Sequence, residues 1–446
     1  MHLTPPQPLS GDQIARANGL GLTLPAICLP RQGLDFQRWA VIACDQFTSQ
    51  PDYWLAAADY VGQAPSTLHM ILPELYLEHP GDLPVDRRIA GINAVMDRYL
   101  ADSTLYRLPA GWIAVDRSTP DHPSRKGLVL AVDLDCYDFR PGNRQLIRAT
   151  EGTVLDRIPP RLAIRRDAPL ELPHVQLLID DPRQTVIEPL LASATSQAPL
   201  YDTELMLDGG HVRGWFIPGG SPAVSQALEA LARLESLQRH GLLFAVGDGN
   251  HSLATAKAHW DALRGRVAPD HPARYALVEV VNIHDPGLAF EPIHRVVFNA
   301  GPADIIAAAE RHFVGQGLAV REISPDSPEL DKVDAPSDGT QTIPMRWCDR
   351  AWLLTLNQPR HSLTAGSLQV FLDEFAGQSA IRIDYIHGGN VVRELAGQGN
   401  PGLLLPRLDK GRFFASIAAD GILPRKTFSM GEAREKRYYF ECRQIR

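Results

Sequence analysis

The sequence contains few cysteines, and they follow no recognisable spacing. The five cysteines in 446 residues are Cys28, Cys44, Cys136, Cys348 and Cys442. No two of them form a CxxC pair, so the pattern predicts neither a zinc knuckle nor a disulfide framework. We expect buried or free thiols in a reducing compartment.

Long apolar runs and an excess of positive charge are also lacking. No stretch approaches the roughly 20 apolar residues of a membrane span, and the N-terminal MHLTPPQPLSGDQ does not resemble a signal peptide. We therefore expect a cytoplasmic protein without a membrane partner. The net charge of −8 argues against general nucleic-acid binding, which needs a basic face. The composition indicates no oligomeric state.

What the sequence does contain is typical of a globular protein with a core: 44% of its residues are hydrophobic and 22% are charged. Apolar runs predict strands at 38–47, 127–139, 174–182, 242–246 and 273–283, and helical periodicity predicts helices at 221–241 and 251–263. Alternating helices and strands indicate a mixed α/β fold. The length suits two domains, which we place at 1–220 and 221–446, with one large domain as the alternative.

The densest group of polar residues is the stretch AVGDGNHSLATAKAHW, residues 245–260. Glycines in a strand-to-helix turn let the backbone approach a ligand, and the N–H groups of the next helix then face it. The stretch therefore predicts a phosphate or carboxylate site. Its candidate residues are Gly247, Asp248, Gly249, Asn250, His251, Ser252 and Lys257. Asp248 is also a candidate metal ligand or proton acceptor. The alternative is that Asp248 and Asn250 shape the turn and cap the helix.

Two further places carry candidate binding residues. Asp45 and Gln46 follow a predicted buried strand, where substrate-binding side chains often project, although they could equally shape a turn. His294 and Arg295 are adjacent, and imidazole beside guanidinium suits an anion. The alternative for this pair is a hydrogen-bonded strand end.

The segment GDGNHSLATAK resembles the signature of the bacterial and archaeal family known as domain of unknown function 1015. The usual form there is Asp-Gly-His-His-Arg, followed by an aromatic residue, Glu, Thr and Ala. The matching residues are Asp248, Gly249, His251, Thr255 and Ala256. Asn250, Ser252 and Ala254 stand where the family has His, Arg and Glu.

The resemblance extends over nearly the whole chain. Residues 38–54, 147–162, 291–298 and 423–428 are similar to further blocks of the family. In the second block Glu151, Thr153 and Arg161 fit the family pattern, and Thr150 replaces its usual His.

The signature turn is also similar to that of the ParB/sulfiredoxin-like superfamily, which includes nucleotide-binding partition proteins and ADP-dependent free serine kinases. The resemblance implies that the turn residues Gly249 to Ser252 hold phosphate, and that Glu151 or Asp248 is a base or metal ligand. Arg148 and Arg161 are candidates for the missing arginine clamp on the phosphate.

These considerations give two hypotheses of different class. The first is a phosphotransferase that uses ATP or ADP with Mg²⁺ and acts on the hydroxyl of a small polar molecule such as serine, with Glu151, Asp248 and His251 as catalytic residues. The second is a nucleotide-binding sensor or scaffold without transfer chemistry, which the changes at Ser252 and Ala254 favour. A metal-dependent hydrolase built on Asp248, His251 and His259 is a third possibility.

Overall fold

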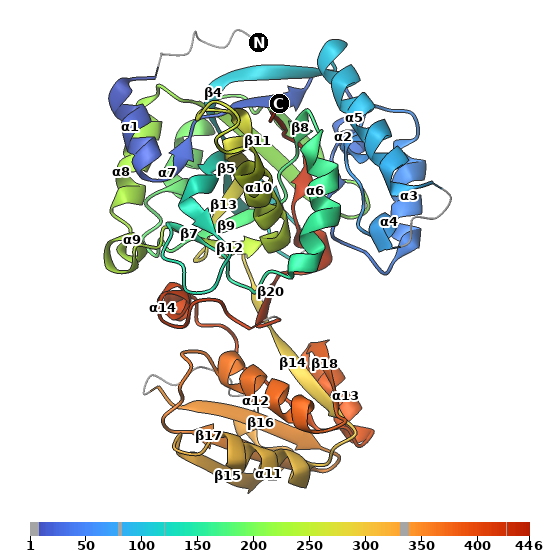
Figure 1. Ribbon diagram of the computed structural model, residues 1–446, viewed down its shortest axis with the longest axis vertical. Coiled ribbons are helices and arrows are strands. Elements are labelled where there is room, and N and C mark those ends of the chain that lie inside the picture. The colour runs from blue at the N-terminus through green and yellow to red at the C-terminus, as the bar shows by residue number, and fades with distance from the viewer. Residues whose placement is uncertain (1–8, 79–82, 120, 331–338, 425) are drawn as a thin grey trace. The chain divides into compact units, whose positions relative to one another are not determined.

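The structure is a computed structural model that describes residues 9–78, 83–119, 121–330, 339–424 and 426–446. The chain forms two compact units, Met1–Leu288 with Gly431–Arg446, and Ala289–Met430 (Figure 1). In sequence the smaller unit is thus an insertion in the larger one. The boundary expected between residues 220 and 221 falls inside the larger unit, between β11 (His211–Pro218) and α8 (Pro222–Ala232).

The larger unit is built on a mixed sheet that has eleven strands among the described residues. Its main path runs β10 (Tyr201–Glu204), β11, β4 (Leu105–Ser118), β5 (Arg125–Asp133), β13 (Tyr275–Asn282), β9 (Gln176–Ile179), β12 (Phe244–Asp248), β7 (Ile147–Arg148) and β6 (Tyr137–Asp138). β1 (Leu22–Thr23) pairs with β5, and β2 (Ala26–Pro30) pairs with β4. The β13–β9, β12–β7 and β6–β7 pairs are parallel, and the other pairs of this sheet are antiparallel.

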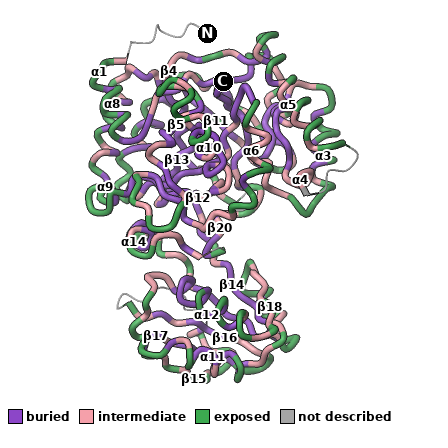
Figure 2. Tube along the Cα trace, in the orientation of Figure 1, coloured by how far each residue is buried: buried purple, intermediate pink, exposed green. Residues whose placement is uncertain are grey.

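Both faces of this sheet are covered, because alternate residues of its strands point to opposite sides. On one face Leu128 and Leu130 of β5 pack with α7 (Ile187–Ala194), α8 and α10 (Asn250–Leu263). On the other face Val129 and Ala131 pack with α3 (Pro51–Val61) and α5 (Val85–Ala101). The labelled strands β5 and β13 run through the buried interior (Figure 2). The remaining helices are α1 (Gly11–Gly19), α2 (Phe36–Trp39), α4 (Leu75–Glu78), α6 (Ile158–Arg166) and α9 (Glu235–His240).

Residues 431–446, which we call the C-terminal segment, return to the second face of the sheet. They contribute β21 (Tyr438–Tyr439), which pairs with β3 (Val41–Ile42), and β22 (Arg443–Gln444), which pairs with β8 (Leu170–Glu171). Tyr438, Tyr439 and Phe440 are buried in the same core as α3 and α5. The segment is therefore an integral part of the larger unit.

The smaller unit has a sheet of seven strands among its described residues. The order is β15 (Leu318–Ile323), β17 (Arg350–Leu356), β16 (Gln341–Trp347), β19 (Gly402–Leu403), β14 (Phe290–Phe298) and β18 (Arg382–His387), and β20 (Phe428–Met430) pairs with β14. The core contains residues of α11 (Pro302–His312) and α12 (Thr364–Gln378) packed with the sheet. α13 (Gly389–Gly397) packs in a separate cluster with Val296 and Leu404, and α14 (Lys410–Asp420) completes the unit.

The predicted mixed α/β fold is confirmed, with some corrections to its elements. The helix expected at 221–241 is two helices, α8 and α9, because Leu234 adopts an extended conformation between them and remains buried. The strand expected at 38–47 is largely wrong, since the short helix α2 ends at Trp39 and β3 covers only Val41–Ile42.

Candidate functional site

The predicted strand–turn–helix element is present as β12, a glycine turn and α10. Gly249 has φ +81°, a left-handed conformation that favours glycine. A Cβ at this position would also lie 3.0 Å from the Cα of Val175. Both facts require glycine here, so the turn brings its backbone close to the neighbouring strand region.

Asn250 links the turn to the segment around Glu151. The backbone N–H of Thr150 donates to Asn250 Oδ1 at 3.2 Å, and the Thr150 hydroxyl donates to the Val246 carbonyl at 2.6 Å. The side chain of Asn250 is thus engaged with Thr150, and α10 has no side-chain cap. An uncapped helix start leaves backbone N–H groups that suit an anion.

His251 makes a second link to the same segment. Its Nε2 accepts a hydrogen bond from the backbone N–H of Val154 at 3.2 Å. A ring nitrogen that accepts is unprotonated, so this contact favours the neutral imidazole with its proton on Nδ1. Glu151 is partly exposed and lies between the two linked residues Thr150 and Val154. The structure therefore brings Glu151, Asn250 and His251 into one region.

A lysine that the sequence analysis did not single out lies beside the acidic residues of the site. Lys436 Nζ is 3.3 Å from Asp248 Oδ2, and both side chains are largely buried. Asp248 Oδ1 also accepts from the N–H of Gly249 at 3.0 Å. The C-terminal segment thus supplies the cation next to the turn.

Asp45 belongs to the same cluster. Burial disfavours its charge, but His174, the Gln46 amide and Lys436 outweigh that effect and lower the pKa of Asp45 below its ordinary value. Gln46 Nε2 donates to Asp45 Oδ1 at 2.9 Å, and His174 Nε2 lies 4.0 Å from Asp45 Oδ2. Asp45 is therefore a carboxylate held in its ionised form.

Tyr439 fixes the orientation of His174. The Tyr439 hydroxyl lies 2.8 Å from His174 Nδ1 and accepts from the N–H of Cys44 at 3.1 Å. With the hydroxyl donating to Nδ1, the ring proton is on Nε2 and faces Asp45. Burial is the largest cause of a strongly raised pKa of Tyr439, which keeps the phenol protonated. Tyr439 and Lys436 are both residues of the C-terminal segment that our sequence analysis missed.

Gln176 lies next to this cluster in the sheet. It is directly opposite Asp248 on β12 and Glu279 on β13. Its side chain is 1% exposed, and its Nε2 has no hydrogen-bond partner in the described part of the chain. Buried donors are rarely left unpaired. The amide of Gln176 is therefore an unsatisfied hydrogen-bond donor next to the Asp45 and Asp248 cluster.

A cavity of about 130 Å³ opens beside the turn. Ser252 and Thr255 of α10 line it together with His174 and Tyr439. The other lining residues are Cys44, Met70, Ile71, Leu72, Glu74, Leu77, Met96, Arg161, Ile164, Arg165, Ala168, Leu170, Glu171 and Leu172. We call it the α10 cavity.

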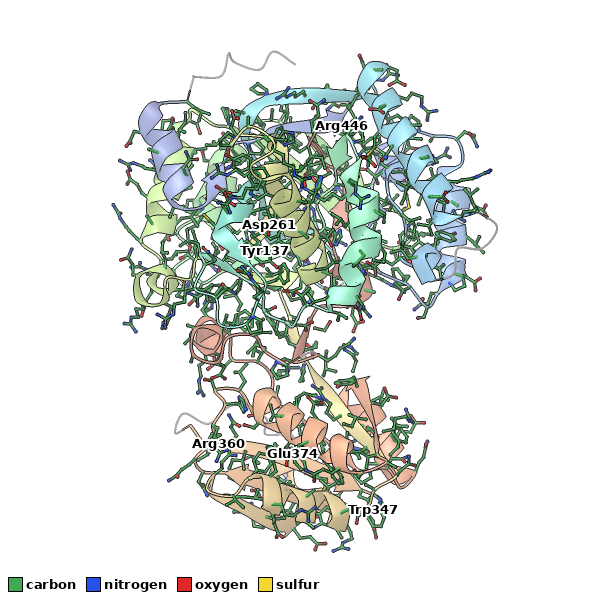
Figure 3. The ribbon with its side chains drawn as sticks, viewed as in Figure 1. Tyr137, Asp261, Trp347, Arg360, Glu374 and Arg446 are labelled. Atoms are coloured by element: carbon green, nitrogen blue, oxygen red, sulfur yellow. The ribbon has the colours of Figure 1, made fainter. Side chains whose placement is uncertain are left out.

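Three basic residues expected at the phosphate have different surroundings. Arg161 lines the α10 cavity, where its Nε donates to Glu74 Oε1 at 2.8 Å. Arg148 donates to the carbonyls of Gln145 and His240 at 3.0 Å each, so its guanidinium is occupied by the backbone. Lys257 Nζ is 2.9 Å from Asp261, which is labelled in Figure 3, and 3.9 Å from Asp135.

His294 and Arg295 belong to the smaller unit, on β14. His294 Nδ1 accepts from the N–H of Leu405 at 3.0 Å, and burial together with Arg295 and His387 lowers the pKa of His294 to about 4. Arg295 is fully buried; it donates to Gln369 Oε1 at 2.8 Å and lies over the Tyr385 ring. These contacts support the alternative of a hydrogen-bonded strand.

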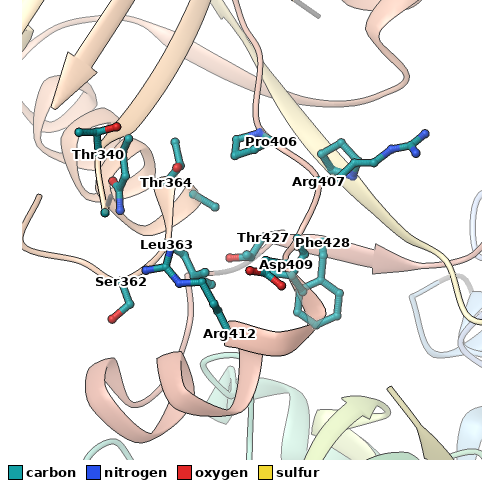
Figure 4. A pocket seen from close by; sticks show the side chains of 15 residues that line it. Thr340, Ser362, Leu363, Thr364, Pro406, Arg407, Asp409, Arg412, Thr427 and Phe428 are labelled. Carbon is teal, nitrogen blue, oxygen red and sulfur yellow. The ribbon is translucent and has the colours of Figure 1, made fainter. Parts of the chain in front are cut away.

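A second cavity, of about 30 Å³, lies within the smaller unit. Figure 4 shows Thr364, Asp409, Arg412 and Thr427 on its wall. None of the candidate residues from the sequence analysis lines this cavity.

The described residues do not fit a metal ion held by Asp248. They include no group of three or more His, Cys, Asp or Glu side chains that could hold a metal. The ammonium of Lys436 already neutralises Asp248 Oδ2. We therefore derive no chemical step through Mg²⁺.

A family model described as protein of unknown function (DUF1015) matches residues 28–375. The chain belongs to the DUF1015 family. The match contains the turn, the Glu151 segment and Asp45, and it ends before the C-terminal segment. Lys436 and Tyr439 therefore lie outside the part of this DUF1015 protein that the family model describes.

No curated protein matches the chain. Among solved structures, a mutant of free serine kinase in complex with ADP matches with a TM-score of 0.38 and 9% identity over 70% of this chain and 91% of that one. A conserved hypothetical protein from Pyrococcus furiosus has a TM-score of 0.33 and 11% identity over 70% and 90% of the two chains. SbnI from Staphylococcus aureus, with a C-terminal truncation, has a TM-score of 0.36 and 11% identity over 68% and 82%.

Among the described residues of this DUF1015 protein, no helix is both long and apolar enough to cross a membrane.

Proposed function

We propose that the chain is a nucleotide-dependent phosphotransferase that acts on the hydroxyl group of a small molecule. One observation carries the proposal: Ser252, in the first turn of the uncapped helix α10, also lines the α10 cavity. A phosphate at the helix start and a hydroxyl compound in the cavity would then meet at Ser252. Helix starts of this kind stabilise phosphate through backbone N–H groups and the helix dipole.

The residues of the site supply the roles that phosphoryl transfer needs. The acceptor oxygen attacks the terminal phosphorus, the bond from that phosphorus to the nucleotide breaks, and the acceptor proton passes to a carboxylate. Glu151 and Asp248 are the candidate bases, and Asp45 holds His174 toward the same cluster. Lys436 neutralises charge on the phosphate oxygens, and His251 binds them. The nucleotide is a di- or triphosphate that leaves with one phosphate fewer.

Binding is the first property to measure. Any ligand that binds the native state raises its melting temperature. We expect at least one of ATP, ADP, CTP and GTP to raise it, with or without Mg²⁺, and we expect His251→Ala to abolish the shift. Incubation of the bound nucleotide with hydroxyl compounds, followed by phosphorus NMR, should then show a phosphate ester. If no nucleotide shifts the melting temperature, the proposal is wrong.

A second candidate is a nucleotide-binding sensor without transfer activity. It is favoured by Ser252 and Ala254, which replace Arg and Glu of the usual family turn. It predicts a nucleotide-dependent shift and no phosphorylated product. Substitution of the base separates the two candidates. If the protein transfers phosphate, Glu151→Gln or Asp248→Asn should abolish turnover and leave nucleotide binding intact. If it is a sensor, the unsubstituted protein should show no turnover.

A further inference from the structure

The walls of the α10 cavity differ in chemistry from one contributing element to the next. Its apolar lining residues are Met70, Ile71, Leu72, Leu77, Met96, Ile164, Ala168, Leu170 and Leu172, which come from the region of 70–77, α5, α6 and 168–172. Its uncharged hydroxyl groups come from α10 and the C-terminal segment, as Ser252, Thr255 and Tyr439. An apolar wall and a hydroxyl-bearing wall therefore meet in one cavity.

The charged residues on the wall lie in ion pairs, although the buried Nε of Arg165 has no hydrogen-bond partner among the described residues. Arg161 is paired with Glu74, and Arg165 Nη2 lies 2.6 Å from Glu171 Oε2. Glu171 also accepts from Arg443 Nε at 2.8 Å. A zwitterionic ligand would compete with these ion pairs for its charged partners, which is costly for buried charges.

Of the hydroxyl groups on the hydroxyl-bearing wall, one has no hydrogen-bond partner within the described part of the chain. The Thr255 hydroxyl donates to the His251 carbonyl at 2.8 Å. The Ser252 hydroxyl makes no hydrogen bond within the described part of the chain. It is thus the side chain best placed to bind a hydroxyl group of the ligand.

We infer that the acceptor is a neutral alcohol with a short alkyl chain, whose hydroxyl lies at Ser252 and whose chain lies against Met70, Leu72 and Met96. That this ligand accepts a phosphate rests on the proposed function. The chemical class of the ligand rests on the cavity alone. A volume of about 130 Å³ is close to the roughly 150 Å³ of an apolar protein cavity that holds benzene, a molecule of six heavy atoms. Free serine, which is zwitterionic and has no alkyl chain, does not fit this description.

The experiment measures binding in the absence of nucleotide, so it does not depend on phosphoryl transfer. Saturation-transfer NMR titrations of the full chain give dissociation constants for 1-propanol, 1-butanol, 1-pentanol and serine. Burial of each added methylene should tighten binding about fourfold. Serine should bind more weakly than 1-butanol.

Two methionines of equal burial provide a matched pair of variants. Met96 lines the cavity and Met206 does not, and each is 3% exposed in the same core cluster. Met96→Gln should weaken 1-pentanol binding about tenfold, since a polar group then faces the alkyl chain. Met206→Gln makes the same change elsewhere and should leave binding unaltered. If Met96→Gln does not fold, Leu77→Gln at a half-buried lining position replaces it.

Three results would overturn the inference: equal affinity across the alcohol series, tighter binding of serine than of the alcohols, or equal weakening in both methionine variants. A chain-length dependence that is lost in Met96→Gln supports it. If the alcohols bind with this chain-length dependence and no nucleotide binds, the proposed phosphotransferase function is refuted, and the inferred ligand class of the cavity remains supported.

Discussion

Lys436 is a cation paired with the candidate base Asp248. A substitution of Lys436 tests whether this lysine or Lys257 binds the phosphate. The Lys436 ammonium is 3.3 Å from Asp248. We predict that Lys436→Met weakens nucleotide binding about tenfold or more, because a charged hydrogen bond contributes roughly 1.5–3 kcal/mol. Lys436→Arg should keep most of the affinity. Isothermal titration calorimetry measures both.

The rival cation is Lys257, which the sequence favoured. The two lysines are equally buried, with side chains 12% and 11% exposed, and each is paired with an aspartate. Lys257→Met should therefore lower the free energy of unfolding about as much as Lys436→Met does, but it should not change the affinity for nucleotide. Loss of binding in Lys257→Met with retention in Lys436→Met would reverse the assignment. Lys126→Met, which removes a lysine paired with Asp285, controls for net charge.

Gly249 permits a second comparison between like residues. Gly249 and Gly241 are both left-handed, with φ +81° and +59°, but a Cβ meets Val175 only at Gly249 and open space at Gly241. We predict that Gly241→Ala costs about 1 kcal/mol of unfolding free energy, and Gly249→Ala about 2–3 kcal/mol. Urea denaturation measures the difference. If both variants lose the same free energy of unfolding, the close approach of residue 249 to Val175 does not affect stability.

Patterns in the sequence indicated part of the candidate site but did not indicate Lys436, the lysine paired with Asp248. Asp248, His251 and Ser252 lie on the predicted strand–turn–helix element, and Asp45, which the sequence indicated as a separate substrate-binding candidate, lies in the cluster beside it. Lys257 is on the same helix but does not line the α10 cavity, because five residues of helix turn its side chain about 140° from that of Ser252. Lys436 carries no local signal, since its place depends on pairing between segments almost 400 residues apart in sequence.

At the scale of elements, the C-terminal segment is held by a buried ionic network. Arg437 pairs with Glu279 of β13 and with Glu441, and these residues are 4%, 2% and 1% exposed. Burial disfavours the charge of Arg437, but Glu441 and Glu279 outweigh it and raise its pKa. The network thus replaces water as the partner of each charge.

We predict that Arg437→Met destabilises the larger unit by about 3–5 kcal/mol, because it leaves two buried carboxylates unpaired. Thermal unfolding monitored by circular dichroism measures this. Arg321→Met removes an exposed pair with Glu329 and should not change the melting temperature. A small effect of Arg437→Met would mean that water reaches the network.

The periodicity of apolar residues predicted the long helices and strands but gave no prediction for the short strands. The apolar pattern located α10, β9 and β13 to within a few residues, because a helix of four turns or a fully buried strand has a clear signature. β21, β22 and β3 have two residues each, too few for any period. Their partners are decided by tertiary packing.

At the scale of the whole molecule, the described part of each unit contains a buried histidine whose lowered pKa keeps it neutral at pH 7. Burial is the main cause that lowers the pKa of His259 in the larger unit and of His294 in the smaller unit to about 4. In the unfolded chain the pKa is about 6.5. Between these values the unfolded state binds more protons, so stability is full above pH 6.5 and falls as the pH drops toward 4.

We predict that lowering the pH from 7 to 5 lowers the free energy of unfolding of each unit by about 2 kcal/mol through its histidine. Calorimetry should show transitions from both units moving to lower temperature. His259→Leu should reduce the shift of the larger unit and leave that of the smaller unit unchanged. A shift of the larger unit that is the same in the variant would assign the pH dependence to other groups.

The division of the chain into units was the least predictable feature. No change of composition marks Leu288 or Gly431, where the chain passes between the units. An insertion leaves no local pattern, because its two ends are recognised only when the surrounding strands pair.

The return of residues 431–446 to the larger unit has a consequence for biosynthesis. A ribosome adds about 5–20 residues per second, so residues 289–430 occupy on the order of ten seconds after the rest of the larger unit has been made. During that time β3 and β8 lack their partner strands, and Asp248 lacks its lysine. A nascent chain can thus fold most of its sheet early, but it acquires a complete site only after the last segment is translated.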